Sequence, residues 1–160
     1  MQQAMLNFCE WLQNTPVVLT IGHTLWGYPY VQLIHFFGLS IWVGTIMMLD
    51  LRLLGLAGRS QSVGQLAKQL SPWTWTALAI VVTGGSLLFS VAAASYFQNP
   101  AFRFKIPLVL TGIAYHIVIV RNVPKWDRSP STPPLAKLAG LLEILLWLAV
   151  ITAAVEIPTY

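Results

Sequence analysis

Four long stretches of this chain are almost free of charged side chains, and this pattern constrains its fold more than any other feature. Roughly 20 consecutive apolar residues are enough for a helix to cross the hydrocarbon core of a bilayer. Charged residues make up only 9% of the chain, against about a quarter of an ordinary soluble domain. The sequence therefore predicts an all-α integral membrane protein, a four-helix bundle over residues 30–160. The expected spans are residues 30–56, 72–96, 102–121 and 135–157.

The segment 1–29 has a different pattern. Its first part places apolar side chains at helical spacing with polar side chains opposite, and Thr15 and Pro16 then offer a cap and a first-turn proline for a second short helix over 17–26. The Gly-Tyr-Pro sequence at 27–29 is expected to break the chain before the first span. Both helices are too short to span, so we expect two amphipathic helices at the membrane surface. The segment has no basic residues typical of a signal peptide.

The basic residues predict the orientation. Only Arg103 and Lys105 flank the tight turn at Asn99-Pro100, whereas the other two connections are rich in basic residues. Loops rich in Lys and Arg stay in the cytoplasm. We therefore expect a multi-pass protein of the bacterial inner membrane with both termini in the periplasm. The residues that flank the two basic connections are Arg52, Arg59, Lys68, Arg121, Lys125, Arg128 and Lys137.

Several functional classes are excluded or unsupported. The nine basic residues are too few and too scattered for a nucleic-acid surface. Cys9 is the only cysteine, which excludes an intrachain disulfide, a CxxCH haem attachment and a thiolate metal cluster. The sequence contains no Gly-rich phosphate loop, HExxH or GxSxG motif. The lipid bilayer is the expected partner, and homo-oligomerisation is compatible with so small a bundle.

Ionisable residues within a span are functional candidates because burying them in lipid costs free energy. His35 is expected roughly 9 Å into the first span from the periplasmic side. Lys105 and Arg103 open the third span at the same side, and long side chains can bring them level with His35. We call this predicted cluster the outer site. His23, on the second short helix, is a candidate second ligand there, or simply an interfacial residue.

His116 and Glu143 form a second predicted cluster, the inner site. The helical rise places them roughly 7 and 9 Å from the cytoplasmic ends of the third and fourth spans, and therefore at a shared depth. His116 is a candidate ligand of a second haem. Alternatively, it pairs with Glu143 to pass protons or to hold a quinone head group. The spacing leaves these alternatives open.

The chemistry of the outer site suggests haem b. Imidazole is the usual axial ligand of haem iron, and basic groups near the interface can bind the propionates. His35 and His116 are the candidate metal ligands, but they are expected roughly 10 to 14 Å apart along the membrane normal, which disfavours one haem bridging both. Small residues of the second span, including Gly84, Gly85 and Ser86, predict either close helix contact or a slot for a flat ligand.

Four motifs carry a resemblance that covers nearly the whole chain. They are FCEWL at 8–12, LDLRLLG at 49–55, PWTW at 72–75 and NPAFRFK at 99–105. Together they resemble a bacterial family of short four-helix inner-membrane proteins, a domain of unknown function. This resemblance supports the architecture and implies no activity.

A more distant resemblance concerns function. His35 with Trp42, Gly44 and Arg52 is similar to the first-span pattern of HemJ-type protoporphyrinogen oxidases and, more loosely, of CopD-type copper proteins. Lys105 with the later Tyr115-His116 pair is similar to the third-span pattern of HemJ. The resemblance implies that a histidine and a lysine from two spans form the functional pair and that haem b is bound.

Three functional hypotheses follow. The leading one is a haem-b-binding membrane cytochrome that transfers electrons to or from a quinone or a redox partner protein. The second is a HemJ-like porphyrinogen oxidase that uses the same outer site, so whether the chain is an enzyme is left open. The third is a structural or copper-type transport subunit without haem, in which the histidines are hydrogen-bonded core residues.

Overall fold

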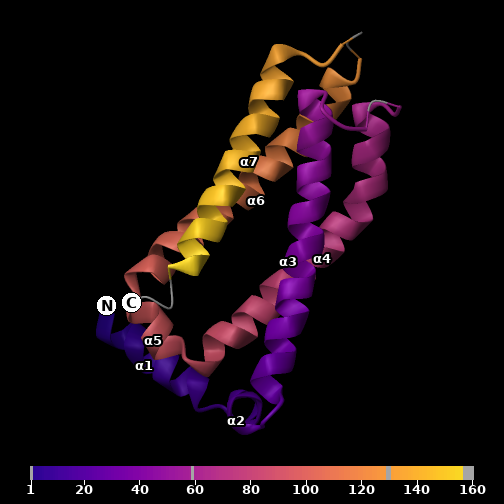
Figure 1. Ribbon diagram of the computed structural model, residues 1–160. Coiled ribbons are helices and arrows are strands. Elements are labelled where there is room, and N and C mark those ends of the chain that lie inside the picture. The colour runs from indigo at the N-terminus through magenta and orange to yellow at the C-terminus, as the bar shows by residue number, and fades with distance from the viewer. Residues whose placement is uncertain (1, 59, 129–130, 157–160) are drawn as a thin grey trace.

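The computed structural model describes residues 2–58, 60–128 and 131–156, and every regular element in these ranges is a helix (Figure 1). Four of the described helices are long and apolar enough to cross a membrane, so the chain is a multi-pass membrane protein. The predicted all-α four-span architecture is confirmed. The long helices are α3 (Gly27–Leu54), α4 (Val63–Val91), α6 (Pro100–Trp126) and α7 (Pro134–Val155), and the short ones are α1 (Gln2–Gln13), α2 (Pro16–His23) and α5 (Ala93–Gln98).

The long helices form two antiparallel pairs, α3 with α4 and α6 with α7, and α3 also packs against α7 (Figure 1). The α3–α4 and α6–α7 connections lie together at one end, which we call the loop end. Helices α1, α2 and α5 gather at the opposite end, which we call the short-helix end. At 1.5 Å per residue, the 28 residues of α3 extend about 42 Å, more than a hydrocarbon core of about 30 Å.

The start of α4 differs from the prediction. The second span was expected to begin at residue 72, but α4 begins at Val63 and contains Pro72. Ser62 and Gln65 form a capping box: the Ser62 hydroxyl accepts from the Gln65 backbone N–H, and the Gln65 side chain accepts from the Ser62 backbone N–H, both at 3.1 Å. This cap starts the helix two turns before the proline.

The other ends shift by a few residues. Pro29 lies in the first turn of α3, where its missing N–H costs little, so α3 begins at Gly27 and the second short helix ends at His23 rather than at residue 26. Ala92 leaves helical geometry, with φ −137° and ψ 44°, and it separates α4 from α5 inside the predicted span 72–96. Helix α6 continues past residue 121 to Trp126, and the predicted end of the fourth span at 157 lies outside the described residues.

The N-terminal helices are docked on the short-helix end. Helix α1 packs against α5, and Cys9 on α1 is only 3% exposed. The Gln13 side chain accepts a hydrogen bond from the Ala94 backbone N–H at 3.3 Å. A Cβ added at Gly22 of α2 would lie 3.3 Å from Val91 of α4, so α2 also contacts the bundle closely.

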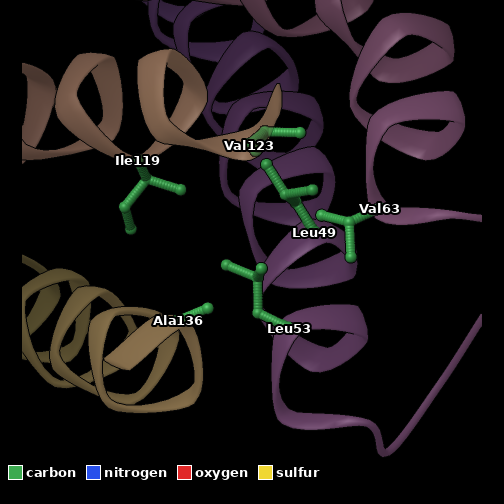
Figure 2. Close-up of a cluster of buried hydrophobic side chains, with 6 residues drawn as sticks. All are labelled: Leu49, Leu53, Val63, Ile119, Val123 and Ala136. Carbon is green, nitrogen blue, oxygen red and sulfur yellow. The ribbon is translucent and has the colours of Figure 1, made fainter. Parts of the chain in front are cut away.

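The tightly packed core lies in the half of the bundle nearer the loop end. One cluster of buried side chains joins all four long helices (Figure 2). Its members are Leu49, Leu53, Val63, Ile119, Val123 and Ala136. A second cluster lies deeper in the bundle and contains Trp42, Ile46, Ala77, Trp147 and Val150.

The half nearer the short-helix end is packed differently. Helix α3 has one buried residue, Gly38, before Trp42, and α6 has none before Gly112. Large apolar side chains on these segments are exposed instead, which is stable where lipid covers them. They include Leu33, Ile34, Phe36, Phe37, Phe104 and Leu110.

Candidate functional site

His116 and Glu143 meet in the interior of the bundle. His116 lies on the buried face of α6, and Glu143 lies on the buried face of α7. The His116 Nδ1 and a Glu143 carboxyl oxygen are 3.0 Å apart, and the two side chains are 3% and 0% exposed. The shared depth predicted from the helical rise is therefore confirmed. Such a contact couples the position of a proton on one group to the charge of the other.

Asp50 on α3 is the third ionisable residue of this cluster. Its side chain is fully buried, and its carboxyl group interacts with that of Glu143. Gly140, one turn before Glu143 on α7, allows the close approach: a Cβ there would lie 3.2 Å from the Asp50 backbone oxygen. Residues from α3, α6 and α7 thus form one buried cluster, Asp50–Glu143–His116.

Two tryptophan rings lie against the imidazole of His116, and a third packs behind one of them. Its ring centroid lies 5.6 Å from that of Trp42 and 6.0 Å from that of Trp75, and Trp42 is in turn 5.7 Å from Trp147. Gly112 of α6 lies directly against the Trp147 ring, which leaves room for the indole between the helices. The rings shield the His116–Glu143 contact from lipid.

His35 lies about one-half helix away from this cluster, on the half of α3 nearer the short-helix end. The imidazole is half-buried, and its Nδ1 is 3.0 Å from the Val81 backbone oxygen on α4. A backbone carbonyl can only accept, so the contact places the proton on Nδ1 and leaves the lone pair on Nε2. This is the tautomer in which histidine binds a metal through Nε2.

The small residues of α4 accommodate this histidine. A Cβ at Gly84 would lie 3.0 Å from the His35 Cβ, and a Cβ at Gly85 would lie 3.1 Å from the His35 Cε1. Of the two predicted uses of the small-residue stripe, close helix contact is the one that these two glycines serve in the structure.

The other residues predicted for the outer site differ in burial and in their relation to His35. Lys105 is half-buried on α6, and its ammonium lies within electrostatic reach of the His35 ring. Arg103 is exposed on the same helix. His23 is exposed on α2, and no hydrogen bond or ring contact joins it to His35 in the described part of the chain.

The two sites are separate. Trp42, which touches the His116 ring, is seven residues beyond His35, or about 10 Å along α3. A separation of this size disfavours one haem that bridges the two histidines. Within the described ranges, no group of three or more His, Cys, Asp or Glu side chains is arranged to hold a metal ion.

A known protein family matches this chain. The profile of the Family of unknown function (DUF6644) matches residues 8–158, almost the entire chain. The chain belongs to DUF6644. The predicted resemblance to an uncharacterised membrane-helical family is thereby confirmed. No curated protein and no solved structure matches the chain, so its chemistry has to be argued from its own residues.

The sequence analysis missed Asp50 as a site residue of this DUF6644 protein. Asp50 lies two residues before Arg52, near the end of the first span, where a charge in the headgroup region is unremarkable. Asp50 shares one face of α3 with Trp42 and Ile46 by helical spacing, but the sequence does not show that this face is the buried one. Trp42 and Trp75 entered the sequence analysis only as parts of motifs, and Trp147 did not enter it, so their packing around His116 was not predicted.

Proposed function

We propose that the protein binds haem b at the outer site and transfers electrons, with His35 as an axial ligand. The observation that supports this proposal is the hydrogen bond between His35 Nδ1 and the Val81 backbone oxygen. It orients the ring and fixes the tautomer in which Nε2 can bind iron. Haem b would supply a one-electron iron couple at this position.

The surroundings of His35 also fit a large, flat, apolar group with anionic substituents. The exposed ring of Phe36 lies 6.0 Å from the His35 imidazole, measured between ring centroids. Lys105, within electrostatic reach of His35, and the exposed Arg103 would pair with the propionates. His116 is left out of this haem site, because its side chain is only 3% exposed and the rings of Trp42 and Trp75 lie against its imidazole.

A reduced-minus-oxidised absorption spectrum of the protein purified from haem-replete cells tests the proposal. We expect a b-type band that is lost in His35→Ala and retained in His116→Ala. His23→Ala is the matched control, because this histidine is exposed and, among the described residues, no hydrogen bond or ring contact joins it to His35. Absence of the band from the wild-type protein, or a band that survives His35→Ala, would overturn the assignment. A colourless preparation would favour the structural or transport alternative.

One observation favours a second function, that of a HemJ-like porphyrinogen oxidase. Lys105 and His35 come from two different helices and lie within electrostatic reach of each other, which is the kind of pair that the HemJ resemblance implies. Complementation of a strain without its own oxidase separates the two functions. An oxidase restores growth, and Lys105→Ala abolishes that growth, whereas an electron carrier restores none.

We further propose that the protein lies in a bacterial inner membrane with the loop end in the cytoplasm and both termini in the periplasm, where a quinone or a redox protein can reach the outer site. The basic connections at the loop end support this orientation. In a Cys9→Ser background, an impermeant maleimide added to intact spheroplasts should label Gln98→Cys and spare Ser131→Cys. The reverse pattern would invert the orientation.

A further inference from the structure

The Asp50–Glu143–His116 cluster is outside the proposed haem site, and its charges require an explanation of their own. Two carboxyl groups and one imidazole are buried together, with exposures of 0%, 0% and 3%. An isolated charge in a low-dielectric interior is strongly unfavourable, and so are two adjacent like charges. The imidazole can balance one carboxylate, and the other carboxyl group then needs a proton.

The hydrogen bonding indicates where this proton is held. Both oxygens of Asp50 and the second oxygen of Glu143 are buried and have no hydrogen-bond donor within the described structure. Two carboxylates cannot bond to each other, because neither has a hydrogen to donate. Asp50 and Glu143 nevertheless interact. A proton shared between them converts this repulsion into a hydrogen bond and satisfies both groups.

Other buried polar groups around the cluster also lack hydrogen-bond partners within the described structure. The indole N–H groups of Trp42 and Trp147 are buried, and no acceptor for them lies among the residues that the structure describes. The Tyr115 hydroxyl, which donates to the Ala139 backbone oxygen at 3.4 Å, lies within electrostatic reach of both carboxyl groups. Buried donors without acceptors are rare in structural cores, where such groups are normally satisfied. Trp42 lies against the His116 ring and Trp147 lies against Trp42, so both indoles border the cluster.

His116 connects the cluster to a small cavity. The cavity has a volume of about 10 Å³, room for about one water molecule. Its lining includes His116 together with Thr45, Ser71 and Thr74, and it continues to Ala67, one turn from the start of α4 at the loop end. The Thr45 and Thr74 hydroxyls donate to backbone oxygens at 2.9 and 3.0 Å, so their own oxygens can accept from a water.

We propose that Asp50, Glu143 and His116 form an intramembrane proton-binding site, which holds one exchangeable proton between the two carboxyl groups and exchanges it with the loop end through His116 and the adjacent cavity. The proton passes between Glu143 and the His116 Nδ1, which are in hydrogen-bond contact. A water in the cavity is the partner on the other side of the imidazole. No step involves His35, so the site can be tested whether or not haem is bound.

Infrared spectroscopy with isotope labelling tests the proposal on the wild-type chain. Asp50 and Asp127 are the only aspartates, and Asp127 is exposed at the loop end. We expect a protonated-carboxyl band at neutral pH that shifts when the protein is labelled with ¹³C-carboxyl aspartate or glutamate. Asp127→Asn should leave the band unchanged. A neutral-pH spectrum without the band, or a band insensitive to both labels, would overturn the shared proton.

Variants test the members of the site. Asp50→Asn and Glu143→Gln should each abolish the shared-proton band, whereas the exposed Glu10→Gln should retain it. His116→Gln should retain the band but slow its exchange in D₂O by about 100-fold, the usual contribution of a positioned proton-transfer group. Unchanged exchange in His116→Gln would contradict the route through the imidazole. The labelled wild-type spectrum decides the shared proton even if a substituted chain does not fold.

Discussion

The two halves of this bundle use the same apolar residue types in different ways. Near the loop end, apolar side chains from all four long helices pack into one buried cluster (Figure 2). Near the short-helix end, aromatic and aliphatic side chains of α3 and α6 face outward, and His35 is only half-buried. In lipid, apolar side chains gain little from mutual burial, so close packing marks where the chain requires one fixed geometry.

The largest expected contrast is between the two intramembrane histidines. His116→Ala leaves Glu143 buried without its partner and should lower the free energy of unfolding by about 3–5 kcal/mol. His35→Ala removes one hydrogen bond to a backbone oxygen and should cost about 1 kcal/mol. Unfolding in mixed micelles, followed by tryptophan fluorescence, gives both values. Equal losses of unfolding free energy in the two variants would show that the two halves are equally rigid.

A second contrast compares two tryptophans. Trp42 is 1% exposed and its ring touches His116, so Trp42→Ala should cost about 3 kcal/mol through lost contacts and a cavity. Trp73 is 63% exposed, and Trp73→Ala should change stability by about 0.5 kcal/mol or less. The same unfolding measurement applies. A large loss for Trp73→Ala would indicate that a protein partner, not lipid, covers that face.

A third contrast uses two glycines of α3. A Cβ at Gly38 would lie 2.7 Å from a methyl carbon of Ile80, so Gly38→Ala should cost about 1–2 kcal/mol by forcing α3 and α4 apart. Nothing lies within 4 Å of a Cβ at Gly44, and Gly44→Ala should gain up to about 1 kcal/mol in helix propensity. Melting temperatures in detergent show whether each substitution stabilises or destabilises the protein. A stabilised Gly38→Ala would mean that α3 and α4 separate readily.

The smallest expected effect concerns the start of α4. Ser62→Ala removes the helix cap and the hydroxyl that donates to an Asp127 carboxyl oxygen at 3.0 Å, and it should cost about 1 kcal/mol. Ser40→Ala is the control, because that exposed hydroxyl donates only to its own helix, at the Phe36 backbone oxygen. If both substitutions are neutral, the cap is not what holds α4 to the α6–α7 connection.

The sequence predicted those features of the fold that depend only on a residue's position along a helix. Span number follows from apolar length, and the pairing of His116 with Glu143 follows from the rise per residue. Rotation about the helix axis was not predictable, because α3 and α7 are apolar on every side and show no amphipathic face. The position of Asp50 beside Glu143 depends on that rotation. The start of α4 was predictable, since a serine three residues before a glutamine is a visible capping box.

Cys9 makes the docking of the N-terminal helices measurable. The only thiol of the chain is 3% exposed where α1 packs against the short-helix end. A thiol reagent can reach it only when α1 lifts away, so the rate of alkylation reports how often that end of the molecule opens. The protein therefore carries an internal reporter of whether a ligand seated beside His35 closes the N-terminal helices over it.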